Sequence, residues 1–127
     1  MFKTVLFPID RSRHALGTVA KALDLARTHD SRLVLLSVLE PGPPEMDDPD
    51  TVARWLQRTR EQVEQAGVIC DVVERQGKPA SVICDVADEL TVDVIVMGTR
   101  DVNLESDRDS TAARVIQVSP CPVLVVP

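Results

Sequence analysis

Five short aliphatic runs, separated by longer stretches with helical periodicity, set the pattern of this chain. The runs are rich in Val, Leu and Ile, and most of them are nearly continuous, which is typical of strands buried on both faces of a parallel sheet. The third run partly alternates apolar and polar positions, as expected of a more exposed strand. The predicted strands are Val5–Ile9, Leu33–Leu39, Val68–Val73, Val92–Met97 and Val123–Val126.

Between the runs, apolar residues recur at the spacing of helices that bury one face. Gly67 supplies a stop for the second helix, and Pro79 occupies the favoured first position of the third. A short fourth helix is predicted from about Ser110 to Val118. The first three apolar stripes are Leu16, Val19, Ala20, Leu23 and Ala26, then Val52, Leu56, Val63 and Ala66, then Val82, Ile83, Val86, Ala87 and Leu90.

Strands that alternate with helices along the whole chain predict one fold class. Right-handed crossovers give an α/β fold, an open five-stranded parallel sheet with helices on both faces. The length of 127 residues suits one domain spanning residues 1–127. Pro41–Asp50, rich in proline and acid, is the stretch that we expect to form a surface loop.

Charge and cysteine content narrow the choice of partners and compartment. The chain carries 14 Lys and Arg against 20 Asp and Glu, a formal net charge of −6. Binding to nucleic acid or anionic lipid draws on basic side chains, so neither partner is expected. No membrane helix or signal peptide is predicted. Cys70, Cys84 and Cys121 form no CxxC spacing, which predicts buried, inert thiols, no metal site and a cytoplasmic location.

Two residues mark a candidate crevice. In an open α/β sheet, ligands bind beyond the carboxyl ends of the strands, where the winding direction reverses. Asp10 ends the first predicted strand, and Gly98 ends the fourth. Each alone fits a structural role, as a helix-entry aspartate or a turn glycine. If the two strands are neighbours, the pair flanks one crevice and indicates a binding site.

The C-terminal run indicates an interface. Val123, Leu124, Val125 and Val126 form a short apolar strand that should lie at an edge of the sheet. An unprotected apolar edge invites pairing with another chain, and pairing with its own copy about a two-fold axis closes the interface. A homodimer through this strand is therefore expected, with a simple buried final strand as the alternative.

Several segments form a specific combination in this order and at this length: Lys3–Asp10, Leu35–Val38, Gly77, Asp93–Arg100 and Ser119–Val126. Through them the chain resembles the universal stress protein family over essentially its whole length. The resemblance implies a Rossmann-like sheet and dimerisation through the fifth strand. It also implies a nucleotide crevice, whose family-position candidates here are Asp10, Val38, Gly98, Arg100 and Ser110.

The loop that holds phosphates in ATP-binding members of that family is degenerate here. Those members carry Gly, two residues, Gly, nine residues, and then Gly followed by Ser or Thr. This chain keeps Gly98, but the second position is Asp101. Counted back from Pro120, the last pair falls on Asp109-Ser110 after seven residues; counted strictly forward, it falls on Thr111-Ala112. Neither register restores the motif.

The replacement of glycine by aspartate has a physical cost for phosphate binding. Glycines let backbone N–H groups approach phosphates, whereas residues 99–110 hold four acids against two arginines. A carboxylate and a phosphate charge ~4 Å apart repel by ~1 kcal/mol in bulk water, and by more in a partly dry cleft. The sequence therefore predicts a non-enzymatic stress-response or regulatory domain with weak or no ATP binding and no cofactor. The alternative is a sensor that binds ATP or AMP in the same crevice. Slow hydrolysis of ATP is compatible with that alternative.

Other chemistry lacks the residues that it needs. A phosphotransfer receiver domain requires an aspartate after the third strand and a lysine after the fifth, but Glu74-Arg75 follows the third and no lysine follows the fifth. The sequence implies no nucleophilic Ser or Cys partner for His14 or His29. Trp55 is expected to pack as a structural residue of the second helix and not to bind a ligand. No catalytic residues are predicted.

Overall fold

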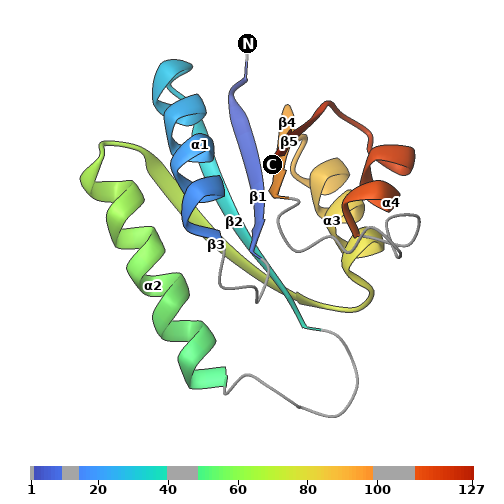
Figure 1. Cartoon of the computed structure of the whole chain (residues 1–127), viewed down its shortest axis with the longest axis horizontal. Coiled ribbons are helices and arrows are strands. Elements are labelled where there is room, and N and C mark those ends of the chain that lie inside the picture. The colour runs from blue at the N-terminus through green and yellow to red at the C-terminus, as the bar shows by residue number, and fades with distance from the viewer. Residues whose placement is uncertain (1, 10–14, 40–48, 99–110) are drawn as a thin grey trace.

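The strands and helices alternate along the chain as the apolar pattern predicts (Figure 1). The computed structural model describes residues 2–9, 15–39, 49–98 and 111–127. The strands are β1 (Thr4–Ile9), β2 (Arg32–Leu39), β3 (Ile69–Gln76), β4 (Val94–Gly98) and β5 (Val123–Val126). The helices are α1 (Ala15–Thr28), α2 (Pro49–Gln65), α3 (Pro79–Glu89) and α4 (Thr111–Val118). No helix in these ranges is long and apolar enough to cross a membrane.

The five strands are parallel and lie in the order β3-β2-β1-β4-β5, which confirms the predicted α/β class. The continuous apolar runs belong to the inner strands, because those strands are buried on both faces. β3 is an edge strand and extends to Gln76, three residues beyond the prediction, since its polar end still pairs with β2. α2 begins at Pro49, so the end of the predicted Pro41–Asp50 loop is helical.

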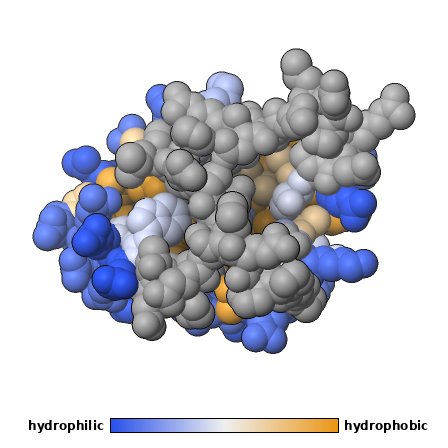
Figure 2. Space-filling model, turned by 60° about the horizontal axis from the view of Figure 1, so that its bottom comes forward, coloured by the Kyte–Doolittle hydropathy of each residue, from blue (hydrophilic) through white to orange (hydrophobic). Residues whose placement is uncertain are grey.

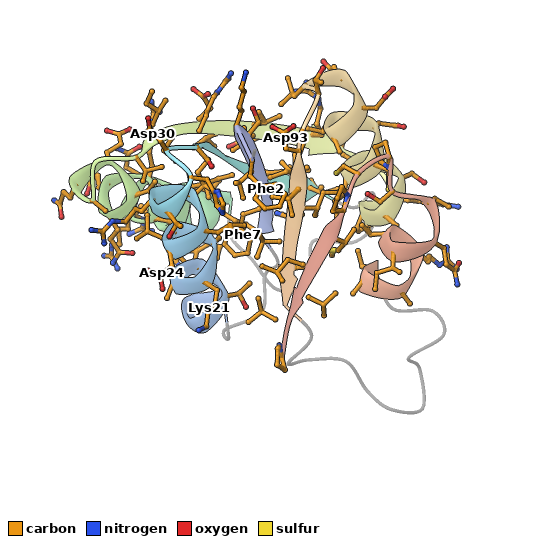
Figure 3. All side chains as sticks on the ribbon, turned by 90° about the horizontal axis from the view of Figure 1, so that it is seen from above. Phe2, Phe7, Lys21, Asp24, Asp30 and Asp93 are labelled. Carbon is orange, nitrogen blue, oxygen red and sulfur yellow. The ribbon has the colours of Figure 1, made fainter. Side chains whose placement is uncertain are left out.

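Two apolar clusters fill the space between the sheet and its helices. One contains buried residues of α1 and α2, and the other contains buried residues of α3 and α4, so each helix pair covers one face. Phe7 lies between α1 and the sheet, whereas Lys21 and Asp24 lie on the outer side of α1 (Figure 3). The predicted stripe of α1 is wrong at Ala20, which is exposed; Ala22 is buried in its place.

β1 joins the two halves of the sheet unequally. It pairs with β2 over its whole length, to Ile9–Ser37, but with β4 only at Val5–Val94 and Leu6–Ile95 within the described residues. Pro8 lies just beyond the last of these pairs and has no amide hydrogen to donate. Because pairing with β2 continues past Pro8, the missing donor falls on the side of β4. Within the described residues, the β1–β4 ladder therefore stops at Leu6–Ile95, before the carboxyl end of either strand.

At the opposite end, a side chain reinforces the short β1–β4 ladder. The Thr4 amide donates to Asp93 Oδ2 over 2.9 Å, and the Asp93 amide donates to the Thr4 carbonyl over 2.9 Å. Asp93 immediately precedes β4. The two reciprocal bonds hold the start of β1 against the start of β4.

We expect Asp93→Ala to lower the free energy of unfolding by about 1–2 kcal/mol, because the part-buried Thr4 amide loses its acceptor. Asp93→Asn keeps an acceptor oxygen and should lose less. Urea denaturation of both variants measures the difference. Asp85→Ala, at an exposed acid of α3, is the matched control and should change stability little; an equal loss in all three variants would contradict a role for the Thr4 bond.

Candidate functional site

The crevice predicted from the sequence falls at the carboxyl ends of β1 and β4, beyond the last described pair between these strands. The two strands are neighbours, so the condition set for a shared crevice is met, and the winding direction reverses between them. Gly98 is the last residue of β4, as predicted, and Val38 is half-buried near the end of β2. The other three predicted site residues, Asp10, Arg100 and Ser110, lie outside the described residues, as do Asp101 and Asp109. Figure 2 views the molecule toward this end, with apolar surface of described residues in view.

Gly98 is in close contact with α1. A Cβ placed at residue 98 would lie 2.7 Å from Thr18 Oγ1. It would also lie within 4 Å of the Cβ and Cγ2 atoms of Thr18. Real Cβ contacts are essentially never that short, so the position requires glycine for packing. Thr18 lies one turn inside α1 and is 7% exposed. The glycine that the sequence places at the crevice therefore also lets α1 approach the end of β4.

A second buried hydroxyl lies level with Gly98. Ser37 of β2 is 6% exposed and is the register partner of Ile9 on β1. Leu6 of β1 is the register partner of Ile95 of β4. Ile9 and Gly98 each lie three residues further along these parallel strands, so the same register places them side by side. Since side chains alternate along a strand and Leu35, Ile9 and Val96 belong to the cluster beneath α1, the row from Ser37 to Gly98 faces α1.

The sequence contained signals for both hydroxyls, which the predictions did not use. Ser37 interrupts an otherwise aliphatic strand, and Thr18 stands next to Val19 on the buried side of α1. A single serine or threonine in an apolar stripe is common in cores. Only the fold shows that these two lie at the crevice end of the sheet.

Burial keeps the three thiols of the described residues protonated. Desolvation raises the pKa of Cys70 to about 11, and it also raises the pKa of Cys84 and of Cys121. The expectation of buried thiols is correct for Cys70, while Cys84 and Cys121 are half-buried. A raised pKa leaves little thiolate, the nucleophilic form, at neutral pH. Within the described ranges, no three His, Cys, Asp or Glu side chains come together as a metal site.

The sequence comparisons identify close relatives. The model of the universal stress protein family matches residues 1–127. "Universal stress protein Sll1654" from Synechocystis is 46% identical over 136 aligned positions, which cover 100% of this chain and 87% of the relative. These matches confirm the resemblance that the motifs indicated.

Solved structures share the fold. A universal stress protein in complex with cAMP superposes with a TM-score of 0.83 at 23% identity, over 98% of this chain and 96% of that one. The universal stress protein from Archaeoglobus fulgidus in complex with dAMP superposes with a TM-score of 0.75 at 24% identity, over 99% of this chain and 98% of that one. At these identities the likeness establishes the fold alone.

We expect Gly98→Ala to cost about 1–3 kcal/mol of stability, because the new methyl group overlaps Thr18 Oγ1. Thr18→Ala removes the hydroxyl that the new methyl group overlaps, so it should recover most of the loss. The double variant Gly98→Ala, Thr18→Ala should therefore be more stable than the sum of the two single effects predicts. Urea denaturation of the four proteins gives the coupling energy.

Thr59→Ala is the matched control for this cycle. Thr59 is a buried helical threonine of α2, and it does not contact Gly98. Its combination with Gly98→Ala should be additive. If the effects of Gly98→Ala and Thr18→Ala are also additive, the contact with Thr18 is not the reason why a larger residue at position 98 is destabilising.

Proposed function

The chain belongs to the universal stress protein family, and from that premise we propose that residues 1–127 form a single, non-enzymatic regulatory domain of the cytoplasm that binds ATP weakly or not at all. The observation that carries this proposal is the loop after β4. Asp101 and Asp109 stand where ATP-binding relatives have glycine, and residues 99–110 hold four acids. The crevice keeps Gly98 from the phosphate-binding pattern, but the charge of its loop opposes a triphosphate.

A second candidate function is the sensing of an adenine mononucleotide. Two observations favour it: Gly98 is retained at the end of β4, and the proteins of similar fold include complexes with cAMP and with dAMP. A monophosphate carries fewer negative charges than ATP, so the acids repel it less. The candidate ligand-binding residues are those predicted from the sequence: Asp10, Val38, Gly98, Arg100 and Ser110.

Isothermal titration calorimetry with Mg-ATP and with AMP tests both candidates. We expect a dissociation constant weaker than about 10 μM for Mg-ATP. If the second candidate is correct, AMP binds more tightly than ATP, because each added phosphate meets the same acids. Tight binding of Mg-ATP would overturn the first proposal, and no heat with AMP would overturn the second.

Two double variants separate charge from bulk. Asp101→Asn with Asp109→Asn removes both charges but keeps the side chains, while Asp101→Gly with Asp109→Gly also restores the space. If charge is the obstacle, both variants bind ATP more tightly at low salt, and the gain shrinks as salt screens it. If neither gains affinity, the shortened loop is responsible.

We propose further that the protein forms a homodimer through β5. β5 is the last strand of the sheet and pairs with β4 on its inner side. Among the described residues four large apolar side chains are exposed, and three of these lie on α4 and β5: Ile116, Val118 and Leu124. An apolar sheet edge flanked by further apolar surface is typical of an interface between copies.

We expect Leu124→Asp to shift the protein toward the monomer, because an unpaired carboxylate would be buried in the interface. Leu124 is 42% exposed in the single chain, so the substitution should leave the fold of the protomer intact. Light scattering after size exclusion, over a dilution series, measures the mass.

Ile69→Asp is the matched control. Ile69 is 69% exposed and begins β3, at the opposite edge of the sheet. This variant should keep the wild-type mass at every concentration. Loss of the dimer in Ile69→Asp but not in Leu124→Asp would place the interface at β3.

A further inference from the structure

The outer edge of β3 is a row of backbone groups that pair with no other strand in the described part of the chain. β3, Ile69–Gln76, is 8 residues long and pairs with β2 on its inner side. The Gly77 amide donates to the Leu39 carbonyl of β2 over 3.0 Å, so Gly77 faces inward. The N–H and C=O groups of one residue point to the same side of a strand, and successive residues alternate, so every second residue before Gly77 bonds to β2 and the others face outward. The outward residues are Cys70, Val72, Glu74 and Gln76.

This edge is open, and its side chains carry charge. The Glu74 carbonyl, one of the outward groups, accepts a hydrogen bond from Arg75 Nη1 over 3.3 Å, so a surface side chain takes the place of a strand. Cys70 and Val72 pack into the cluster beneath α1 and α2, so the alternate side chains lie on the other face of β3. On that face the side chains of Asp71 and Arg75 are 39% and 43% exposed. An open edge of this length invites a further strand, and these charges select which one.

One register makes β3 complementary to a second copy of itself. Two identical strands pair in antiparallel fashion about a two-fold axis, and each outward residue must lie opposite an outward residue. With the axis at Val73, all outward residues are paired, and Asp71 lies opposite Arg75 of the second copy, twice by symmetry. Residues in such pairs exchange no hydrogen bonds and their side chains are the closer ones, so the opposite charges can meet.

The other registers are less favourable. An axis at Asp71, Glu74 or Arg75 sets like charges directly against each other. An axis at Val72 sets neither charge of Asp71 and Arg75 opposite its counterpart, and it leaves the end of each strand without a partner. The charge pattern of β3 therefore selects the axis at Val73.

We propose that β3 is a second self-association surface, at which the open edges of two copies pair as antiparallel strands with Val73 at the two-fold axis. Two ion pairs already present in each chain extend across this contact. Arg32 pairs with Asp71, and Arg75 pairs with Glu89 over 3.4 Å. Joined across the contact, these pairs form a row of four charges that alternate in sign.

The β3 contact is independent of the homodimer proposed at β5, because the two strands lie at opposite edges of the sheet. Where both contacts form, the copies build an open chain that shares one continuous sheet. Ile69 lies opposite Gly77 of the second copy, which has no side chain, so the contact does not bury Ile69. Substitution of Ile69 therefore leaves the β3 contact in place.

Sedimentation velocity of the Leu124→Asp protein isolates the β3 contact, because this substitution acts on β5 alone. We expect weak, concentration-dependent dimerisation with a dissociation constant of about 10 μM to 1 mM, the range of a small polar interface. Added salt should weaken it, since the paired charges are exposed. A protein that stays monomeric at about 1 mM would overturn the proposal.

Exchange of the two charges tests the register. Asp71→Arg and Arg75→Asp each set like charges against each other twice, so each should weaken dimerisation at least about fivefold. The double variant Asp71→Arg, Arg75→Asp restores opposite charges and should recover most of the affinity. Glu74→Arg is the matched control: it makes the same change in charge on the same strand, but opposite the uncharged Val72. A double variant no better than the single ones, or an equal loss in Glu74→Arg, would contradict the register.

A proline tests the backbone pairing. The Glu74 N–H faces outward, so Glu74→Pro removes a donor from the open edge and none from the ladder with β2, a position where strands tolerate proline. This variant should abolish dimerisation, while its melting temperature stays close to that of Glu74→Arg. If Glu74→Pro folds and still dimerises as before, the contact does not use the edge of β3.

The outcomes separate this contact from the proposed β5 homodimer. If Leu124→Asp keeps the wild-type mass and Glu74→Pro becomes monomeric, the β5 proposal fails and the β3 contact stands. If Leu124→Asp is monomeric at every concentration, the β5 proposal stands and the β3 contact fails.

Discussion

The unequal pairing of β1 is the constraint on which the rest of the structure depends. β1 has six paired positions with β2 but two with β4, so the sheet consists of a β3-β2-β1 part and a β4-β5 part joined over a short ladder. Pro8 removes a donor just where that ladder ends. Cohesion between the two parts must therefore come from apolar side chains on both faces and from the Asp93–Thr4 bonds at the other end.

Burial on both faces explains why so much of the fold could be predicted from the sequence. A strand covered by helices on both sides must be apolar at nearly every position, and the run from Leu33 to Leu36 is entirely buried. The end of β3 could not be predicted in this way, because residues 74–76 are polar and exposed and pair only through the backbone. Ala20 and Ala22 could not be distinguished either, because they lie at opposite edges of the apolar stripe of α1, and periodicity does not show which edge faces the sheet.

The candidate site was predictable in location and less so in composition. The rule that ligands bind where the winding reverses places the crevice at Gly98 from element order alone. The contact of Gly98 with Thr18 and the row that includes Ser37 depend on the approach of α1 to the sheet and on strand register, which periodicity does not encode. Periodicity shows which residues share a face; it does not show which residues of different elements meet.

The fold and the local charge favour different ligands. Together they restrict the class of ligand more than either does alone. The crevice of an open α/β sheet suits a nucleotide, whereas the four acids that we propose to oppose ATP repel a ligand in proportion to its negative charge. The combination therefore favours a ligand of low negative charge. A fold alone would not support this, because one fold hosts many functions and the residues of the site decide among them.

The crevice and the proposed interface are also joined by the backbone. Gly98, which lies against Thr18 of α1, is the register partner of Val126 on β5. A ligand that displaces the end of β4 must therefore displace the strand through which we propose that two copies pair. Linkage makes such an effect reciprocal: whatever dimerisation does to ligand affinity, the ligand does to dimerisation by the same factor. The regulatory function that we propose needs only this, a small molecule at one end of β4 that changes which surface β5 offers to a partner.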